Sequence, residues 1–194
     1  VGHVMTSLKA AGMDENTLVL FSSDNGPVWY EENTEQFSHA ATGSLRGIKA
    51  SAWEGGHRVP FLARWPARVS GGVVTNHTVA FCDVFATFAA LAGQESIAEG
   101  VARDSVSFAG LLLEPEGKLP ARRPILHDSK TIRAGEWKLL TSKRGRGFGA
   151  PKGVKYSVEL YHLKEDLSER NNLADQMPEK VEALLGLIEV MLAQ

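Results

Sequence analysis

The chain has 194 residues, of which 43% are hydrophobic and 23% charged, and its formal net charge is -2. This length suits one compact domain, or one domain with a small appendage, around a core of useful size. The small net charge excludes an overall basic field, so we expect no nucleic acid and no membrane surface as partners. No apolar run approaches the ~20 residues that span a bilayer. The single cysteine, Cys82, cannot form an internal disulfide.

Residues 1–12 have the pattern of an amphipathic helix. Val1, Val4, Met5 and Leu8 fall on one face, and Gly12 suits a left-handed cap at the C-terminus of that helix. A gene product seldom begins inside a helix, and these residues have no apolar core of a signal peptide. We therefore expect the chain to be a fragment of a longer protein.

A buried strand is predicted for residues 17–21, which are apolar on both faces. Asp24 and Asn25 follow it in the run Ser-Ser-Asp-Asn-Gly-Pro, at the end of a strand where open α/β sheets place their ligands. Lys49 comes later in a glycine-flanked segment, before Trp-Glu-Gly-Gly and a second strand over 58–65. Taken alone, Asp-Asn-Gly is most often a turn, and a lone lysine is usually solvated.

The segments after these strands are less regular. Residues 28–45 are polar without clear periodicity and are expected to form a loop. A buried helix is predicted over 79–92, with Thr78 as its N-cap and Gly93 at its end. Residues 94–123 read as a connection that contains a short apolar turn at 108–113.

The last third of the chain has a different sequence pattern, with several short strands followed by one helix. Short strands are predicted at 124–127, 131–133, 137–141 and 154–163, with the second and third joined as a hairpin. A final helix has Pro178 in its first turn and a clean apolar stripe, so we expect it to pack on this small sheet.

The central block closely resembles the sulfatase family. The strand, Asp-Asn-Gly, a spacer, Leu-Arg-Gly-x-Lys, WEGGHRVPF and ARWP occur in that order, and the similarity covers nearly the whole chain. Sulfatases are formylglycine-dependent hydrolases of sulfuric esters with an alkaline-phosphatase-like α/β fold. The resemblance implies that residues 1–115 form the C-terminal part of a mixed sheet flanked by helices. Residues 116–194 would then form a small α+β subdomain, with an antiparallel sheet and a C-terminal helix.

The resemblance also implies roles for individual residues. The family residues that match Asp24 and Asn25 bind a divalent cation, usually Ca²⁺, and oxygen donors equally suit Mg²⁺. Lys49 matches the catalytic lysine whose ammonium contacts a sulfate oxygen of the substrate. Arg46 and His57 flank this lysine, and we expect substrate binding or positioning from both; the alternative for each is a structural hydrogen bond or a solvated side chain.

The family nucleophile is absent from the chain. It lies in a sequence C/S-x-P-S/A-R, which occurs nowhere in the 194 residues. We expect formylglycine and the remaining cation ligands to lie upstream, and this fragment alone to be inactive on an aryl sulfate. The chain also departs from the family at Ile48 and Ala50, where glycine is frequent, which concerns the local backbone more than Lys49.

Two alternatives stay open. A non-catalytic module that binds sulfated glycans would use Lys49 and the basic, glycine-rich residues 143–152, and a hydrolase of phosphate or phosphonate esters would share the fold. The substrate is expected to be a sulfated small molecule or glycan. The compartment is unknown, with periplasmic, extracellular or lysosomal locations implied by the family. Strand 17–21 would leave a bare sheet edge, through which we expect self-association.

Overall fold

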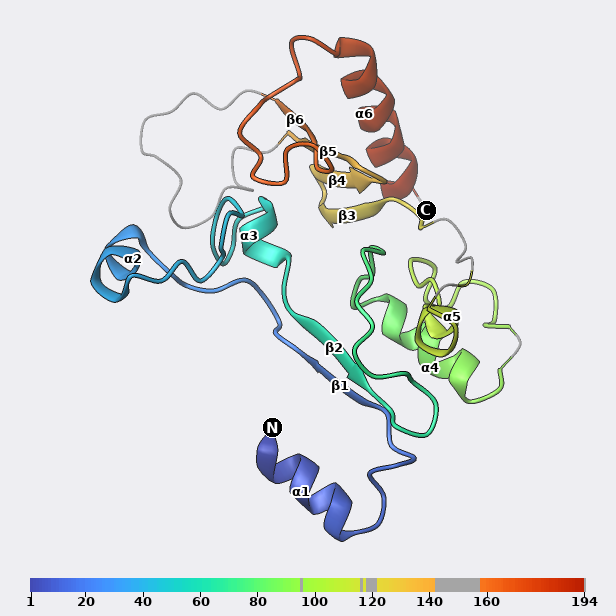
Figure 1. Ribbon diagram of the computed structural model, residues 1–194. Helices are drawn as coiled ribbons and strands as arrows, with labels where there is room; N and C mark the ends of the chain where they lie inside the picture. Colours follow the sequence, from blue (N-terminus) through green and yellow to red (C-terminus); the bar gives the residue numbers. More distant parts are fainter. Residues whose placement is uncertain (95, 116, 118–121, 142–157, 194) are drawn as a thin grey trace. The chain divides into compact units, whose positions relative to one another are not determined.

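The computed structural model describes residues 1–94, 96–115, 117, 122–141 and 158–193. Two compact units result, one from residues 1–22 and 61–123 and the other from residues 23–60 and 124–194 (Figure 1). The basic loop 143–152 lies outside the described residues. So do the first residues of the strand predicted at 154–163.

The first unit contains a helix and a two-stranded antiparallel sheet. Helix α1 spans Gly2–Ala10, and strand β1, Val19–Ser22, pairs with β2, Phe61–Arg64. The three predicted elements are confirmed, with β1 starting two residues later than expected. The burial predicted for β1 on both faces is wrong, because Phe21 is 46% exposed; Leu62 of β2 is 56% exposed. Self-association through this sheet stays a prediction.

Helix α4 begins later than its sequence pattern suggested. It spans Asp83–Leu91, so Thr78 is not its N-cap. The buried Asp83 carboxylate instead accepts hydrogen bonds from Ala80 N at 2.8 Å and Val106 N at 2.9 Å. These bonds hold residues 80–83 in a turn and tie the start of the helix to a distant segment, which a local capping rule cannot include.

The core of the first unit is small. Helix α5, Ala109–Leu113, confirms the predicted apolar turn and contributes to a cluster centred on buried Phe108. The Phe108 ring meets Phe61 edge-on, with centroids 5.7 Å apart. Helix α4 is not buried around its circumference as expected, because Phe85 and Phe88 are each about half exposed.

A short helix interrupts the predicted loop 28–45 of the second unit. Helix α2 spans Glu31–Phe37, and the Tyr30 backbone N–H donates to Asn33 Oδ1 at 3.0 Å. Glu31 and Glu32 lie in the first turn, where negative charge stabilises a helix. Seven residues give less than two full periods, so the apolar periodicity carried no signal here.

The second unit contains a four-stranded antiparallel sheet in the order β3-β4-β5-β6. The predicted hairpin is confirmed between β4 and β5, and Gly135 in its turn has φ +60°. The final helix α6 carries proline at its N-terminus as predicted, and no described helix is both long and apolar enough to cross a membrane. The elements are β3 Ile125–Asp128, β4 Thr131–Ala134, β5 Trp137–Leu140, β6 Glu159–His162 and α6 Pro178–Leu192.

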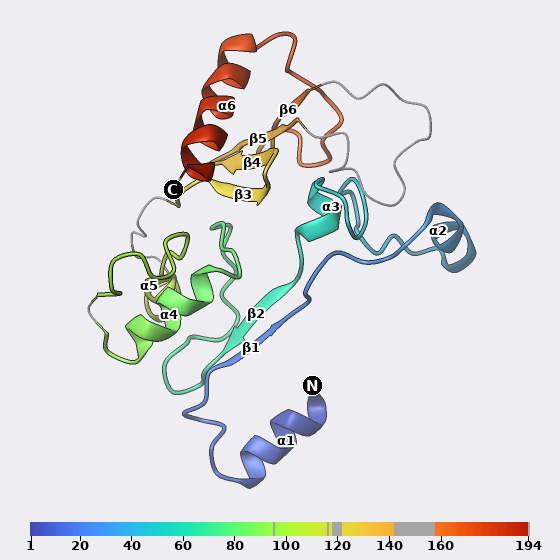
Figure 2. The same cartoon turned by 180° about the vertical axis from the view of Figure 1, so that it is seen from behind.

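This sheet is covered on both faces. Side chains alternate along a strand, so Leu139 and Lys138 of β5 point to opposite sides. Helix α6 packs on the Leu139 side, because Leu139 belongs to one cluster with Leu184 and Ile188 of that helix. Both ribbon views show α6 lying along the sheet (Figures 1 and 2). Ala52 and Trp53 pack on the other side against Leu140, Tyr161 and Leu163. The segment that carries Lys49 is thereby attached to the small sheet.

Candidate anion and cation site

Two segments of the second unit are joined by backbone hydrogen bonds. Gly26 N donates to Gly56 O at 2.8 Å, and Lys49 N donates to Pro27 O at 2.9 Å. Gly55 N donates to Arg46 O at 2.7 Å, which closes the second segment on itself. These bonds place the polar run after β1 beside the segment that carries Lys49.

The backbone around Lys49 takes an unusual path. Gly47 has φ +82° and Ala50 has φ +68°, both in the left-handed region. Ser51 N donates to Ile48 O at 3.0 Å and closes the turn on which Lys49 lies. The conformation costs about 1 kcal/mol for a residue with a Cβ, which explains why glycine suits position 50 while the chain still tolerates alanine.

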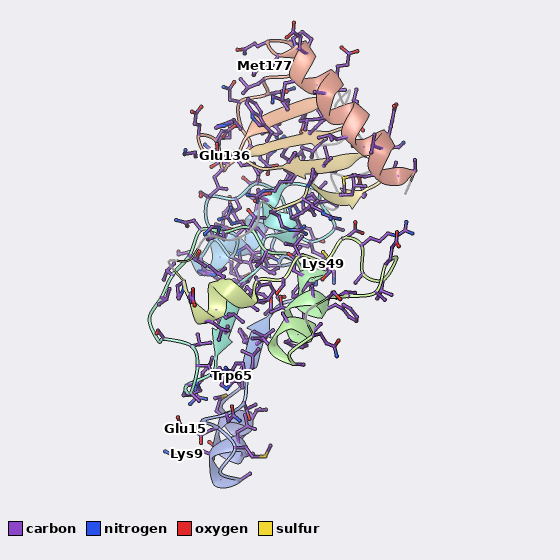
Figure 3. The ribbon with its side chains drawn as sticks, turned by 90° about the vertical axis from the view of Figure 1, so that its right-hand side faces the viewer. Lys9, Glu15, Lys49, Trp65, Glu136 and Met177 are labelled. Carbon is purple, nitrogen blue, oxygen red and sulfur yellow. The ribbon has the colours of Figure 1, made fainter. Side chains whose placement is uncertain are left out.

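A hollow of about 610 Å³ lies between these segments. Asn25 and Lys49 both line it. Asn25 Oδ1 is buried and accepts no hydrogen bond from any described residue, whereas the Lys49 side chain, labelled in Figure 3, is exposed. Asn25, which carries an acceptor oxygen, and Lys49, which carries an ammonium, therefore line one cavity. Its lining consists of Ser23, Asn25, Gly26, Pro27, Val28, Ala41, Thr42, Leu45, Lys49, Arg58, Val59 and Pro60.

Asp24 is exposed and is not among the lining residues. Within the described part of the chain, no three His, Cys, Asp or Glu side chains converge on a metal position. Calcium takes about 6–8 oxygen ligands. Asp24 and Asn25 can therefore supply only part of a cation shell.

Arg46 is engaged by the small sheet. Its Nη1 donates to Tyr161 Oη and to the Glu169 carbonyl oxygen, each at 2.9 Å. Its guanidinium carbon lies 3.9 Å from the centre of the Trp53 ring, a cation–π distance. These contacts fix the start of the 46–58 segment, and Arg46 is not among the residues that line the hollow.

A buried ion cluster fixes the other end of that segment. The side chains of Glu54, Lys138 and Glu169 are fully buried, and Lys138 Nζ lies 2.9 Å from a carboxylate oxygen of each acid. The Glu54 backbone N–H also donates to Glu169 Oε2 at 2.6 Å. Burial alone would raise the pKa of Glu54, but the His57 hydrogen bond and the Lys138 charge hold it far below its usual range. Burial raises the pKa of Glu169 against the opposing charge of Lys138.

His57 belongs to the same cluster. Its Nε2 lies 3.2 Å from Glu54 Oε1, and its ring centre lies 3.9 Å from that of the His127 ring, with the two planes tilted by 42°. Burial lowers the pKa of His57, although its hydrogen bond to Glu54 opposes this. His57 is therefore neutral at pH 7, and it is not among the residues that line the hollow.

Comparison with known proteins identifies the family. The sulfatase family model matches residues 1–94. An N-acetylgalactosamine-6-O-sulfatase of Bacteroides thetaiotaomicron is 33% identical over 97% of the chain, and human arylsulfatase A is 31% identical over 96%. The chain belongs to the sulfatase family. It spans 39% and 40% of the lengths of these two sulfatases.

Solved sulfatase structures share the fold. One, from a study of glycosaminoglycan metabolism by Bacteroides thetaiotaomicron, matches with a TM-score of 0.78 and 32% identity, over 100% of this chain and 42% of that one. A sulfatase from Pseudoalteromonas sp. matches with a TM-score of 0.72 at 22% identity, over 99% of this chain and 40% of that one. The expected α/β class, with an antiparallel C-terminal sheet and a final helix, is confirmed.

The resemblance to sulfatases predicted five residues for the cation and substrate site, and the structure brings two of them together. Asn25 and Lys49 share the hollow, whereas Asp24, Arg46 and His57 are not among its lining residues. Substrate binding by Arg46 and His57 stays a prediction. Sequence reasoning missed five residues of this cluster: Glu54, which precedes two glycines, His127, Arg133 and Lys138, which lie in short strands, and Glu169, which lies in a polar run without any distinguishing pattern.

The partly buried pair of His57 and His127 predicts a loss of stability in acid. Burial, together with His57 and Lys138, lowers the pKa of His127 to about 3. The unfolded chain binds a proton near pH 6.5 while the folded chain does not, so stability falls as the pH drops from 6.5 towards 3. Between pH 7 and pH 5 the loss due to His127 is about 2 kcal/mol. Urea unfolding at pH 7 and pH 5 should show that the free energy of unfolding of H127Q falls by about 2 kcal/mol less than that of the wild type. Equal losses in the two proteins would show that His127 is not the group responsible.

Proposed function

We propose that the whole protein is a sulfatase that hydrolyses the sulfate ester of a small molecule or glycan. The observation that supports this proposal is that Asn25 and Lys49 line one hollow, and that the buried Asn25 Oδ1 accepts no hydrogen bond from any described residue. The relatives are named sulfatases, which favours sulfate over phosphate. The formylglycine nucleophile would come from outside these 194 residues, and we propose that this chain alone shows no turnover.

The donor set fits a hard divalent cation. An amide oxygen and a carboxylate suit Ca²⁺ or Mg²⁺ better than softer metals, and Asn25 Oδ1 has no described donor to satisfy it. We propose that Asn25 and Asp24 hold part of that cation's shell. The bound cation would neutralise charge on the sulfate group and orient it.

Lys49 has a separate task in this proposal. Its ammonium binds a sulfuryl oxygen and stabilises the negative charge that the sulfate group carries through the reaction. The hydrogen bond from Lys49 N to Pro27 O fixes the backbone from which the side chain extends. At about 4 Å in a solvent-exposed site, such a charge pair contributes about 1 kcal/mol, and more as the site is shielded from water.

Replacing Lys49 tests the anion site. At a sulfate concentration ten times its Kd, binding should raise the Tm of the wild type by about 3–5 °C above a chloride solution of equal ionic strength. In K49M the apparent Kd for sulfate should rise at least fivefold, because the ammonium is lost. Thermal unfolding followed by circular dichroism across a sulfate titration measures both quantities.

Sulfate also stabilises proteins without binding, by exclusion from their surface. The control is therefore K9M, which removes an exposed lysine of α1 and should keep the wild-type response. Equal responses in K49M and the wild type would overturn the sulfate site. A larger response to phosphate than to sulfate would favour a phosphate ester hydrolase instead.

A further inference from the structure

The buried ion cluster around Glu54 carries more positive than negative charge. Its two carboxylates, Glu54 and Glu169, are matched by Lys138 and by Arg133, whose Nη1 lies 3.5 Å from Glu54 Oε2. Arg58 adds a third cation, with its Nη1 3.4 Å from the same oxygen. Within the described part of this unit, the cluster therefore has a surplus of one positive charge.

The surplus lies where a solute can reach it. The side chain of Lys138 is fully buried and that of Arg133 is 19% exposed, whereas that of Arg58 is 47% exposed. His57 and His127 do not change this balance at pH 7, since burial lowers the pKa of both. Arg58 is thus the cation of the cluster that is accessible from solvent.

Arg58 also lines the hollow that contains Lys49 and Asn25. A guanidinium has five N–H donors in a planar fork, and the described contacts of Arg58 use one of its nitrogens on Glu54. A fork of this kind matches two oxygens of an oxyanion at once, which an ammonium does not. Geometry and charge together therefore suit Arg58 for an anionic ligand.

We propose that Arg58 is a second sulfate-binding residue of the hollow, and that Glu54 is its positioning residue. The inference rests on the proposed sulfate site, and adds to it a bidentate contact beside the single ammonium of Lys49. Glu54 can hold Arg58 without cancelling its charge, because Lys138 and Arg133 already compensate the acids. Because Glu54 is bound to Lys138 of the small sheet, residues 54–58 hold Arg58 in a fixed position relative to that sheet.

Sulfate titration of the folded chain separates a binding role from a structural one. If Arg58 only satisfied Glu54, R58M would lower the Tm in chloride but leave the sulfate-induced rise unchanged. We expect instead that the apparent Kd for sulfate rises about tenfold in R58M. The matched control R170M removes an exposed arginine of the same unit and should keep the wild-type Kd.

A conservative variant covers the case in which R58M does not fold. R58K keeps a positive charge beside Glu54 but lacks the fork, so its Kd for sulfate should rise about threefold or more while the Tm in chloride stays close to wild type. Suppose that the wild type responds to sulfate and that K49M binds it more weakly. An unchanged Kd in a folded R58M or R58K variant would then overturn the role of Arg58 and leave the sulfate site itself standing. A wild type that responds to sulfate no more than K49M would overturn the sulfate site and this inference with it.

Discussion

Replacing Lys138 by methionine should lower the free energy of unfolding by about 3–5 kcal/mol. Lys138 is fully buried and lies 2.9 Å from one carboxylate oxygen of both Glu54 and Glu169. Its removal leaves two acids in the protein interior without their shared cation, and a buried charge that loses its partner is strongly destabilising. Domains of this size have about 5–15 kcal/mol of stability, so the variant would keep only part of it. Urea unfolding measures the difference.

Two further variants test whether the loss of stability in K138M comes from the buried charges. K130M removes an exposed lysine from the turn between β3 and β4, and should change stability by no more than about 0.5 kcal/mol. The double variant K138M/E54Q removes one uncompensated acid, so its loss should be smaller than the sum of the two single losses by at least about 1 kcal/mol. Strict additivity would mean that the Lys138–Glu54 contact contributes nothing to folding.

The elements with strong local signals were predictable. Helix α6 combines an apolar stripe with Pro178 at its start, and the β4–β5 hairpin has Gly135 in a left-handed turn. These features act within a few residues, so they can be read from the sequence. Helix α4 shows the limit, because Asp83 caps the preceding turn through Ala80 and also binds Val106, 23 residues away.

The candidate site was predictable only in part. The resemblance to sulfatases singled out Asn25 and Lys49, and the structure places both at one hollow. The supporting cluster has no local pattern, since Glu54 and Lys138 are 84 residues apart in the chain. Lys138 lies between apolar neighbours in β5, where alternation alone would place it on a solvent face. It is buried because the 46–58 segment covers that face.

The close approach of the two site segments predicts that G26A disrupts the hollow. A Cβ at Gly26 would overlap the carbonyl oxygen of Gly55 and come within 2.9 Å of the carbonyl carbon of Gly56. Both are backbone atoms, so relief requires a shift of the segment that carries Glu54 and loss of the Gly26–Gly56 hydrogen bond. Overpacking and the lost bond together should cost about 2–4 kcal/mol.

The same shift should weaken sulfate binding, because Asn25 and Lys49 are held together by these two segments. The matched control is G186A: Gly186 lies within α6, and nothing is within 4 Å of a Cβ built there. Alanine is favoured over glycine in a helix by about 1 kcal/mol, so this control should raise the free energy of unfolding. Opposite signs for two identical substitutions would show that backbone contact, and not glycine content, shapes the hollow. A G26A variant that keeps wild-type stability and sulfate affinity would mean that the backbone contact between Gly26 and Gly55 does not shape the hollow.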